Sequence, residues 1–334
     1  LALRVLDDLA GQDFIPIYVD LLSVTSKENF VNKLVSAVTK GIGKSLPTES
    51  FLQTIRNLFT RIIPSVDFRP EGISVSAKFD TSVTTHALIS DFLDGLEEHA
   101  KRQEKRCLLV FDEFQEITEL PESKEIEGLL REKLQASRVI SCFFVGSRRR
   151  VLEEMFTDQR RPFYKMTMLF KLGKIQRESL AHYVSDRFSL TGKDCPLPLA
   201  GRIYDDVDGH TYYVQKLSHI VWDKTTGSVT EETVAESFRQ LLEAESGDFH
   251  GIWTNLGWTE KRVLMAIALE STAQPYASAF LSRYSLSIGS MQKGLKQLIV
   301  KDIVEVTETK TYQPTDPILM RWCRVVSSSG DLRP

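Results

Sequence analysis

The sequence contains few cysteines, and their spacing does not suggest that they pair or bind zinc. Only four occur among 334 residues, at Cys107, Cys142, Cys195 and Cys323, and none belongs to a C-x-x-C pair. Such wide spacing argues against a disulfide framework and against a zinc site. Cys107 and Cys142 lie in apolar runs that predict buried strands. We therefore expect reduced core thiols and a cytoplasmic protein.

Long apolar runs and a large net charge are also missing. No run approaches the roughly 20 apolar residues that cross a membrane, and no signal-peptide pattern is visible at the start. The 42 basic and 45 acidic residues leave a net charge of −3, which creates no overall attraction for nucleic acid or anionic membranes. A composition of 42% hydrophobic and 26% charged residues is typical of a soluble globular protein, here long enough for two or three domains.

One segment carries most of the functional information. The apolar run from Leu108 to Phe111 leads directly into two acidic residues, Asp112 and Glu113. A short continuous apolar run predicts a strand buried on both faces. Open α/β sheets bind ligands at the C-terminal ends of such strands, where acidic residues can position Mg²⁺ and polarise water. The alternative is a buried strand that ends in two solvated acids at a turn.

The first half of the chain alternates predicted strands with predicted helices. Such alternation predicts an α/β fold with a parallel sheet and right-handed crossovers. Residues 73–79 alternate with period two and predict one arm of an exposed hairpin. The expected strands are 14–21, 107–112, 139–147 and 166–172, and the expected helices are 1–9, 26–40, 86–102 and 124–136.

From about residue 176 the pattern becomes helical. Segments 179–190, 210–222 and 230–244 predict amphipathic helices, and 246–257 predicts a linker. The remainder predicts a winged helix by its order of elements. We expect helices at 260–269, capped by Thr259, at 277–283, and at 287–300, capped by Ser287, followed by strands at 303–307 and 311–313.

Together these segments resemble the AAA+ ATPases of the archaeal-type ATPase group, which are related to the origin-recognition initiators and to the STAND ATPases. The resemblance is carried by LLVFDEFQ (108–115), VISCFFVGS (139–147), DGHTYYVQKL (208–217) and the winged-helix tail. It implies a P-loop NTPase core at residues 1–172 with sheet order 5-1-4-3-2 and the first strand absent from the sequence. It also implies a helical lid at 173–247 and a winged helix at 248–330.

The resemblance also implies roles for individual residues. Asp112 would position Mg²⁺, Glu113 would be the catalytic glutamate, and Ser147 would contact the γ-phosphate of ATP. His210 matches the lid motif near the nucleotide base. The alternatives are a turn-forming serine at Ser147 and a helix-start histidine without a nucleotide role. The related regulatory ATPases usually have proline where this chain has Thr211.

The phosphate-binding loop G-x-x-x-x-G-K-[ST] is not found in the sequence. Gly41-Ile-Gly-Lys-Ser45 comes near it, but Val38 stands where the first glycine should be. The segment also follows a predicted helix rather than a strand, and Pro47 prevents a regular helix from continuing. We interpret it as a helix C-cap and loop. The resemblance places the true loop just before Leu1, and we expect the natural chain to extend by about 30 residues or more on that side.

Basic residues suggest two further sites. Arg160 and Arg161, downstream of Arg148-Arg149-Arg150, are candidates for an arginine finger that reaches a neighbouring subunit's γ-phosphate, as in homo-oligomeric AAA+ proteins. The alternative is a solvated charged face. In the winged helix, Lys293, Lys296 and Lys310 are candidates for contacts with the phosphates of double-stranded DNA. Winged helices also dock proteins, so a protein partner is the alternative.

The leading interpretation is an ATP- and Mg²⁺-binding switch, or slow ATPase, that couples its nucleotide state to DNA or protein binding through the winged helix. A second interpretation is a non-enzymatic DNA-binding or regulatory scaffold with a degenerate or structural nucleotide site. A third is a sequence-specific transcription factor built on a degenerate ATPase core.

Overall fold

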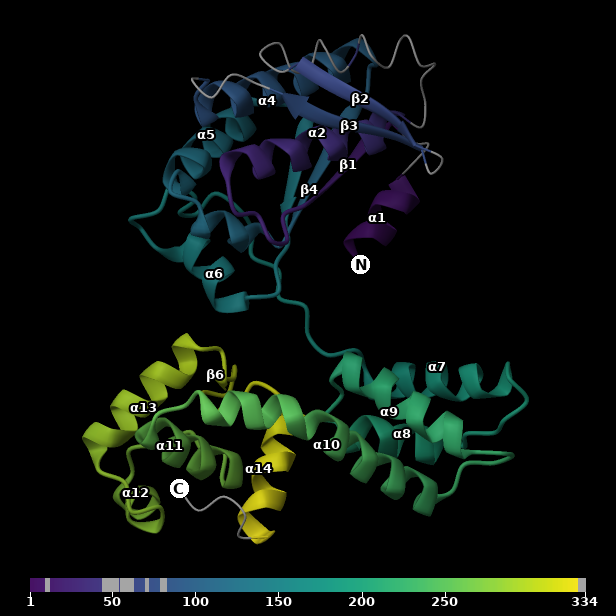
Figure 1. Ribbon diagram of the computed structural model, residues 1–334, viewed down its shortest axis with the longest axis vertical. Helices are drawn as coiled ribbons and strands as arrows, with labels where there is room; N and C mark the ends of the chain where they lie inside the picture. Colours follow the sequence, from purple (N-terminus) through teal and green to yellow (C-terminus); the bar gives the residue numbers. More distant parts are fainter. Residues whose placement is uncertain (10–12, 44–53, 55–62, 70–71, 79–82, 330–334) are drawn as a thin grey trace. The chain divides into compact units, whose positions relative to one another are not determined.

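The computed structural model describes residues 1–9, 13–43, 54, 63–69, 72–78 and 83–329 (Figure 1). Contacts divide the chain into two compact units, Leu1–Phe170 and Lys171–Pro334. Among the described helices, none is both long and apolar enough to span a membrane.

The first unit is built on a parallel sheet of three described strands. These are β1 (Phe14–Asp20), β4 (Arg106–Asp112) and β5 (Ile140–Phe144), in the order β1-β4-β5. The register places Asp20 opposite Asp112, so both strands end at the same edge of the sheet. The predicted parallel α/β sheet is confirmed, and its order agrees with the 4-3-2 part of the expected arrangement.

The central strand β4 is buried on both faces, which explains its continuous apolar sequence. Leu108 and Val110 pack on one face with Leu6 of α1 (Ala2–Leu9). Leu109 and Phe111 join the larger core on the other face. That core includes α2 (Lys27–Gly43), α4 (Thr85–Arg102) and α5 (Ser123–Ala136). Full burial of each such side chain stabilises the fold by about 1.5–3 kcal/mol.

Side-chain caps explain where two of these helices begin. The Ser26 hydroxyl accepts a hydrogen bond of 3.2 Å from the Asn29 amide at the start of α2. The Thr84 hydroxyl likewise accepts a hydrogen bond from the Ala87 amide at the start of α4. The predicted hairpin is also present, with β2 (Ile63–Arg69) paired antiparallel to β3 (Gly72–Lys78). A short 3₁₀ helix, η1 (Phe114–Glu119), follows β4. Helix α6 (Arg149–Thr157) follows β5.

The strand predicted at residues 166–172 is wrong. This segment is irregular and pairs with no described strand. Met166 is half-buried against the core, but the large apolar side chains after it are exposed, Met168 to 89% and Phe170 to 78%. A strand needs a neighbour to satisfy its backbone groups, and β5 has β4 as its single described neighbour.

The second unit begins with four helices, α7 (Arg177–Ser189), α8 (Leu197–Asp206), α9 (Thr211–Lys224) and α10 (Glu231–Thr254). The sequence patterns predicted three of them and missed α8. The linker expected at 246–257 is wrong over most of its length, because α10 continues to Thr254. Phe249 and Trp253 keep the helix amphipathic there, since both side chains are buried.

The C-terminal part is the expected winged helix with one additional helix. It contains α11 (Trp258–Leu269), α12 (Ser278–Arg283), α13 (Ile288–Val300), the antiparallel strands β6 (Val304–Val306) and β7 (Tyr312–Pro314), and α14 (Pro317–Ser329), which the patterns did not predict. Ser287 caps α13 as expected. The cap expected at Thr259 is wrong: Gly257 is the N-cap, and its amide donates to Glu260 at 2.6 Å.

A polar contact joins the two parts of this unit. The Tyr213 hydroxyl on α9 donates to Asp316 Oδ2 at 2.6 Å, and Asp316 Oδ1 accepts from the first amides of α14. Glu245 of α10 lies beside the same hydroxyl at 3.4 Å and pairs with Lys216. Helices preceding the winged helix are therefore hydrogen-bonded directly to it.

Candidate functional site

The two acidic residues of the LLVFDEFQ segment lie at the C-terminal edge of the sheet, as predicted. Asp112 is the last residue of β4, and Glu113 follows in the left-handed region with φ of 51°. This conformation is uncommon for a residue with a side chain. It turns the chain sharply, and the Glu113 amide donates to Asp112 Oδ1 at 3.0 Å.

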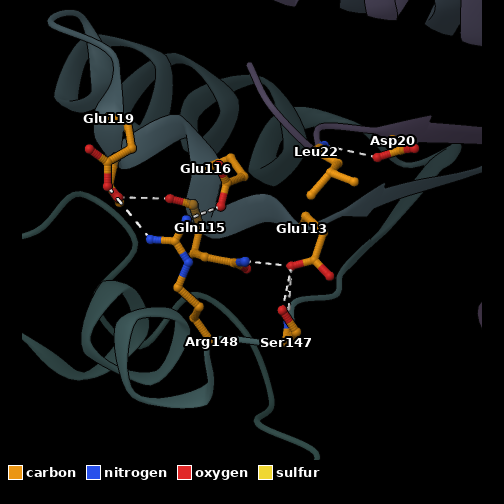
Figure 2. A network of polar contacts seen from close by, with 9 residues as sticks. Asp20, Leu22, Glu113, Gln115, Glu116, Glu119, Ser147 and Arg148 are labelled. Carbon is orange, nitrogen blue, oxygen red and sulfur yellow. Dashed lines mark hydrogen bonds and ion pairs between the residues drawn. The ribbon is translucent and has the colours of Figure 1, made fainter. Parts of the chain in front are cut away.

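Asp112 also accepts a hydrogen bond from the neighbouring strand. The donor is the Tyr18 hydroxyl on β1, which bonds to Asp112 Oδ2. Burial raises the pKa of Tyr18, and the hydrogen bond to Asp112 raises it further, so the phenol stays protonated and remains a donor. Asp20 ends β1 beside this pair, and its Oδ1 accepts from the Leu22 amide at 2.8 Å (Figure 2).

The carboxylate of Glu113 is held from two directions through one oxygen (Figure 2). Ser147 donates to Oε2 with its hydroxyl at 2.8 Å and with its amide at 3.2 Å. The side-chain amide of Gln115 donates to the same oxygen. Partial burial would raise the pKa of Glu113, but these hydrogen bonds and the nearby Arg148 outweigh it and lower that pKa. Glu113 is therefore an ionised base at neutral pH.

Arg148 closes this side of the site. Its guanidinium pairs with Glu116 of η1 and lies 3.7 Å from Glu119 (Figure 2). These pairs connect the start of α6 to the 3₁₀ helix that carries Gln115. The site thus contains a positive charge near Glu113.

The acidic residues fit a Mg²⁺ site that also uses waters and phosphates as ligands, but not a metal site made of protein ligands alone. The described part of the chain contains no cluster of three or more His, Cys, Asp or Glu that could hold an ion by protein ligands alone. Mg²⁺ differs from most metals in retaining several waters, and it often takes one or two carboxylates together with substrate phosphates. Asp112 at the strand end fits the role of a single carboxylate ligand.

The Gly41–Ser45 segment does not form a phosphate loop over the residues that are described. Gly41 and Gly43 belong to α2, while Lys44 and Ser45 lie outside the described residues. A Cβ added at Gly41 would lie 2.6 Å from the Pro16 carbonyl oxygen. The glycine therefore allows α2 to approach β1, which is a packing role.

The structure places the two arginine-finger candidates differently. The Arg161 guanidinium makes a two-point ion pair with Glu127 of α5. The Glu127 side chain is fully buried, and the Arg161 side chain is 19% exposed. Arg160 is 87% exposed and pairs with Asp158 at 2.9 Å. That hydrogen bond from Arg160 lowers the pKa of Asp158 to about 2. Arg161 thus has an internal partner, and Arg160 extends into solvent.

The remaining predicted residues all lie in the second unit. His210 is the exposed N-cap of α9, and its ring is 4.9 Å from that of Tyr213. Lys293 and Lys296 are exposed on α13, and Lys310 is exposed in the turn between β6 and β7. Their exposure is compatible with contacts to DNA phosphates, and such contacts stay a prediction.

Sequence reasoning missed two residues that contact the acidic pair. Tyr18 lies two residues before Asp20, and the period-two alternation of a strand puts both on one face. Gln115 lies two residues after Glu113, at the end of the LLVFDEFQ segment. Its contact with Glu113 depends on the left-handed turn at Glu113, which no local pattern announces.

Comparison with known proteins identifies the fold. Residues 247–325 match the family model described as "Probable winged helix domain". The Walker-type ATPase PABY2304 of Pyrococcus abyssi superposes with a TM-score of 0.63 at 14% identity, over 97% of this chain and 94% of that one. The ORC2 protein of Aeropyrum pernix, in its ADPNP–ADP complexes, superposes with a TM-score of 0.52 at 15% identity, over 99% and 83%. None of the curated proteins matches the chain by sequence.

These similarities agree with the resemblance read from the sequence. The chain has the AAA+ P-loop ATPase fold, consisting of a parallel α/β core, further helices and a C-terminal winged helix.

Proposed function

We propose, from this AAA+ fold, that the protein is an ATP-binding switch or slow ATPase whose nucleotide state controls binding of DNA or a protein through the winged helix. The observation that supports this best is the Asp112–Glu113 pair at the end of β4, with Glu113 joined to Ser147 beyond the next strand. The solved ADPNP–ADP complexes of ORC2 from Aeropyrum pernix support the choice of an adenine nucleotide. The buried free thiols are consistent with action in the cytoplasm.

The chemistry would depend on Mg²⁺, which would supply positive charge to offset the charge that develops on the phosphates of ATP. Asp112 would supply a carboxylate ligand to the ion. Glu113, which is ionised at neutral pH, would accept a hydrogen bond from the attacking water. Ser147 currently donates its hydroxyl hydrogen to Glu113, so it would orient Glu113, and contact with a γ-phosphate would require that hydroxyl to rotate.

Transmission to the winged helix would use the second unit. His210 would lie near the nucleotide base at the start of α9, and Tyr213 on the same helix donates to Asp316 at the start of α14. A shift of α9 on nucleotide exchange would therefore act directly on the winged helix. Arg160, which extends into solvent, is the candidate to reach the γ-phosphate of a neighbouring copy in a homo-oligomer.

One observation favours the scaffold alternative. Both carboxylate oxygens of Asp112 already accept hydrogen bonds, one from Tyr18 and one from the Glu113 amide. A site in which these bonds persist would hold nucleotide, if at all, without a metal at Asp112. The dependence of ATP binding on Mg²⁺ separates the two functions.

The natural full-length protein should bind ATP more tightly with Mg²⁺ than with EDTA, and Asp112→Asn should lose that difference. We expect the affinity for Mg²⁺–ATP to fall by at least about tenfold, because one of the ion's few protein ligands is lost. Isothermal titration calorimetry measures both conditions, and Asp20→Asn on the neighbouring strand is the matched control. Metal-independent binding that the Asp112 variant retains would favour the scaffold.

Duplex DNA should bind the winged helix through Lys293, Lys296 and Lys310. We expect Lys293→Glu with Lys296→Glu to weaken binding more than tenfold and to lower the slope of log affinity against log salt by about 2, since two phosphate contacts are lost. Fluorescence anisotropy measures this. The control variant is Lys174→Glu with Lys224→Glu, which makes the same charge change outside the winged helix. In the wild type these two lysines pair with Asp208 and Glu236, respectively. Absence of binding at low salt would point to a protein partner.

A further inference from the structure

Gln115 is a buried amide whose hydrogen bonding is incomplete. Its side chain lies on η1 directly after β4 and is 1% exposed. The nitrogen donates to Glu113 Oε2, while the carbonyl oxygen Oε1 has no hydrogen-bond partner among the described residues. A buried acceptor without a partner costs about 1–3 kcal/mol. An apolar side chain of similar shape would avoid that cost, so packing alone does not account for an amide here.

The chain around Gln115 leaves space for this amide. Gly146, between β5 and Ser147, faces it, and a Cβ added there would lie 2.0 Å from Gln115 Oε1. The backbone of Gly146 is not in the left-handed region, because the described glycines with positive φ are Gly192 and Gly209. Backbone conformation therefore permits alanine at Gly146, and the Gln115 amide is what opposes it.

The contacts of Glu113 are strongly asymmetric. Three donors, from Gln115 and from the hydroxyl and amide of Ser147, all reach Oε2. Oε1 has no hydrogen bond from any described residue, and Figure 2 shows it pointing away from Gln115 and Ser147. One oxygen is thus anchored and the other is available to a water molecule.

We infer that Gln115 is a positioning residue, which together with Ser147 fixes Oε2 of Glu113 and thereby presents Oε1 to the attacking water. Its role in hydrolysis rests on the proposed function, whereas its hold on the carboxylate does not. Carboxamide nitrogen suits this task because it donates to an ionised carboxylate without adding charge. A carboxyl group at the same place would repel Glu113.

The test compares Gln115→Met with wild type by two independent readouts. The first is a crystal structure of each protein, in which the position of the Glu113 carboxylate is compared. We expect this carboxylate to rotate or to become disordered in Gln115→Met, because one of the two side chains that hold Oε2 is lost. The second is ATP hydrolysis by the natural full-length protein, where kcat should fall by about tenfold and KM should stay constant. Gln135→Met, exposed on α5, is the matched control.

Gly146→Ala tests the same contact without altering either partner. It should displace the amide and release the Glu113 carboxylate in the same way, and in a Gln115→Ala background it should add nothing. An unchanged position of the carboxylate in folded Gln115→Met and Gly146→Ala would overturn the inference, whether or not ATP is hydrolysed. A displaced carboxylate in a protein that never hydrolyses ATP would support the positioning contact and overturn the proposed ATPase.

Discussion

Glu113→Gln should reduce ATP hydrolysis by a factor of about 10²–10⁴, the usual contribution of a general base, while ATP affinity should change by less than about twofold. Glutamine keeps the shape of the side chain and an oxygen that can accept from Gln115 and Ser147. It removes the negative charge with which Oε1 would orient water. Binding and turnover should therefore separate, because the lost interaction acts only on the reacting water.

This prediction is measured by single-turnover hydrolysis and equilibrium ATP binding on the natural full-length protein. Glu116→Gln is the matched control, since it makes the same change three residues away in a side chain that pairs with Arg148. Equal turnover in wild type and Glu113→Gln would remove Glu113 from the chemistry. A wild-type protein that binds ATP without turnover would instead be the scaffold, with nucleotide in a structural role.

Glu127→Ala should destabilise the first unit by about 3–5 kcal/mol. The side chain of Glu127 is fully buried and makes a two-point ion pair with Arg161. Removal of one partner leaves the other charge buried and unpaired, which is far more costly than loss of an exposed ion pair. The same pair holds the chain after α6 against α5, where Arg131 also donates to the Pro162 carbonyl.

The position of the tryptophans makes this prediction specific. All four, Trp222, Trp253, Trp258 and Trp322, belong to the second unit. Hydrogen exchange in α5 and β4 should therefore show the destabilisation, and the tryptophan fluorescence transition should stay unchanged. Glu132→Ala, at an exposed position of α5, is the control. Glu127→Leu with Arg161→Leu should change the free energy of unfolding only slightly, because it leaves no unpaired charge. A large loss in that double variant as well would assign the cost to packing instead.

Much of the fold was predictable because it depends on local periodicity. The strands β1 and β4 and the helices α2, α4, α5 and α13 follow from apolar spacing and from caps such as Ser26 and Ser287. Prediction failed where a partner decides the conformation. The apolar residues 166–172 have the composition of a strand but pair with no strand in the described part of the chain. Residues 246–254 contain glycine and polar residues yet remain helical because Phe249 and Trp253 are buried.

The candidate site divides in the same way. Asp112 and Glu113 were identified because two acidic residues that directly follow a continuous apolar run are visible in the sequence. Ser147 was identified through the family resemblance, and its hydrogen bond to Glu113 was not foreseen. Arg161 had two alternatives, an exposed finger or a solvated face, and the structure gives it a buried partner instead.

The sequence alone determined the α/β class, the winged helix and the acidic pair at the end of a buried strand. These features depend on hydrophobic periodicity and on turn chemistry, which act over a few residues. The tertiary structure alone decided that Tyr18 bonds to Asp112, that Gln115 and Ser147 share one oxygen of Glu113, and that Arg161 pairs with Glu127. Such contacts join residues on different strands, helices and turns, so they exist only once the sheet register and the backbone turn at Glu113 are formed.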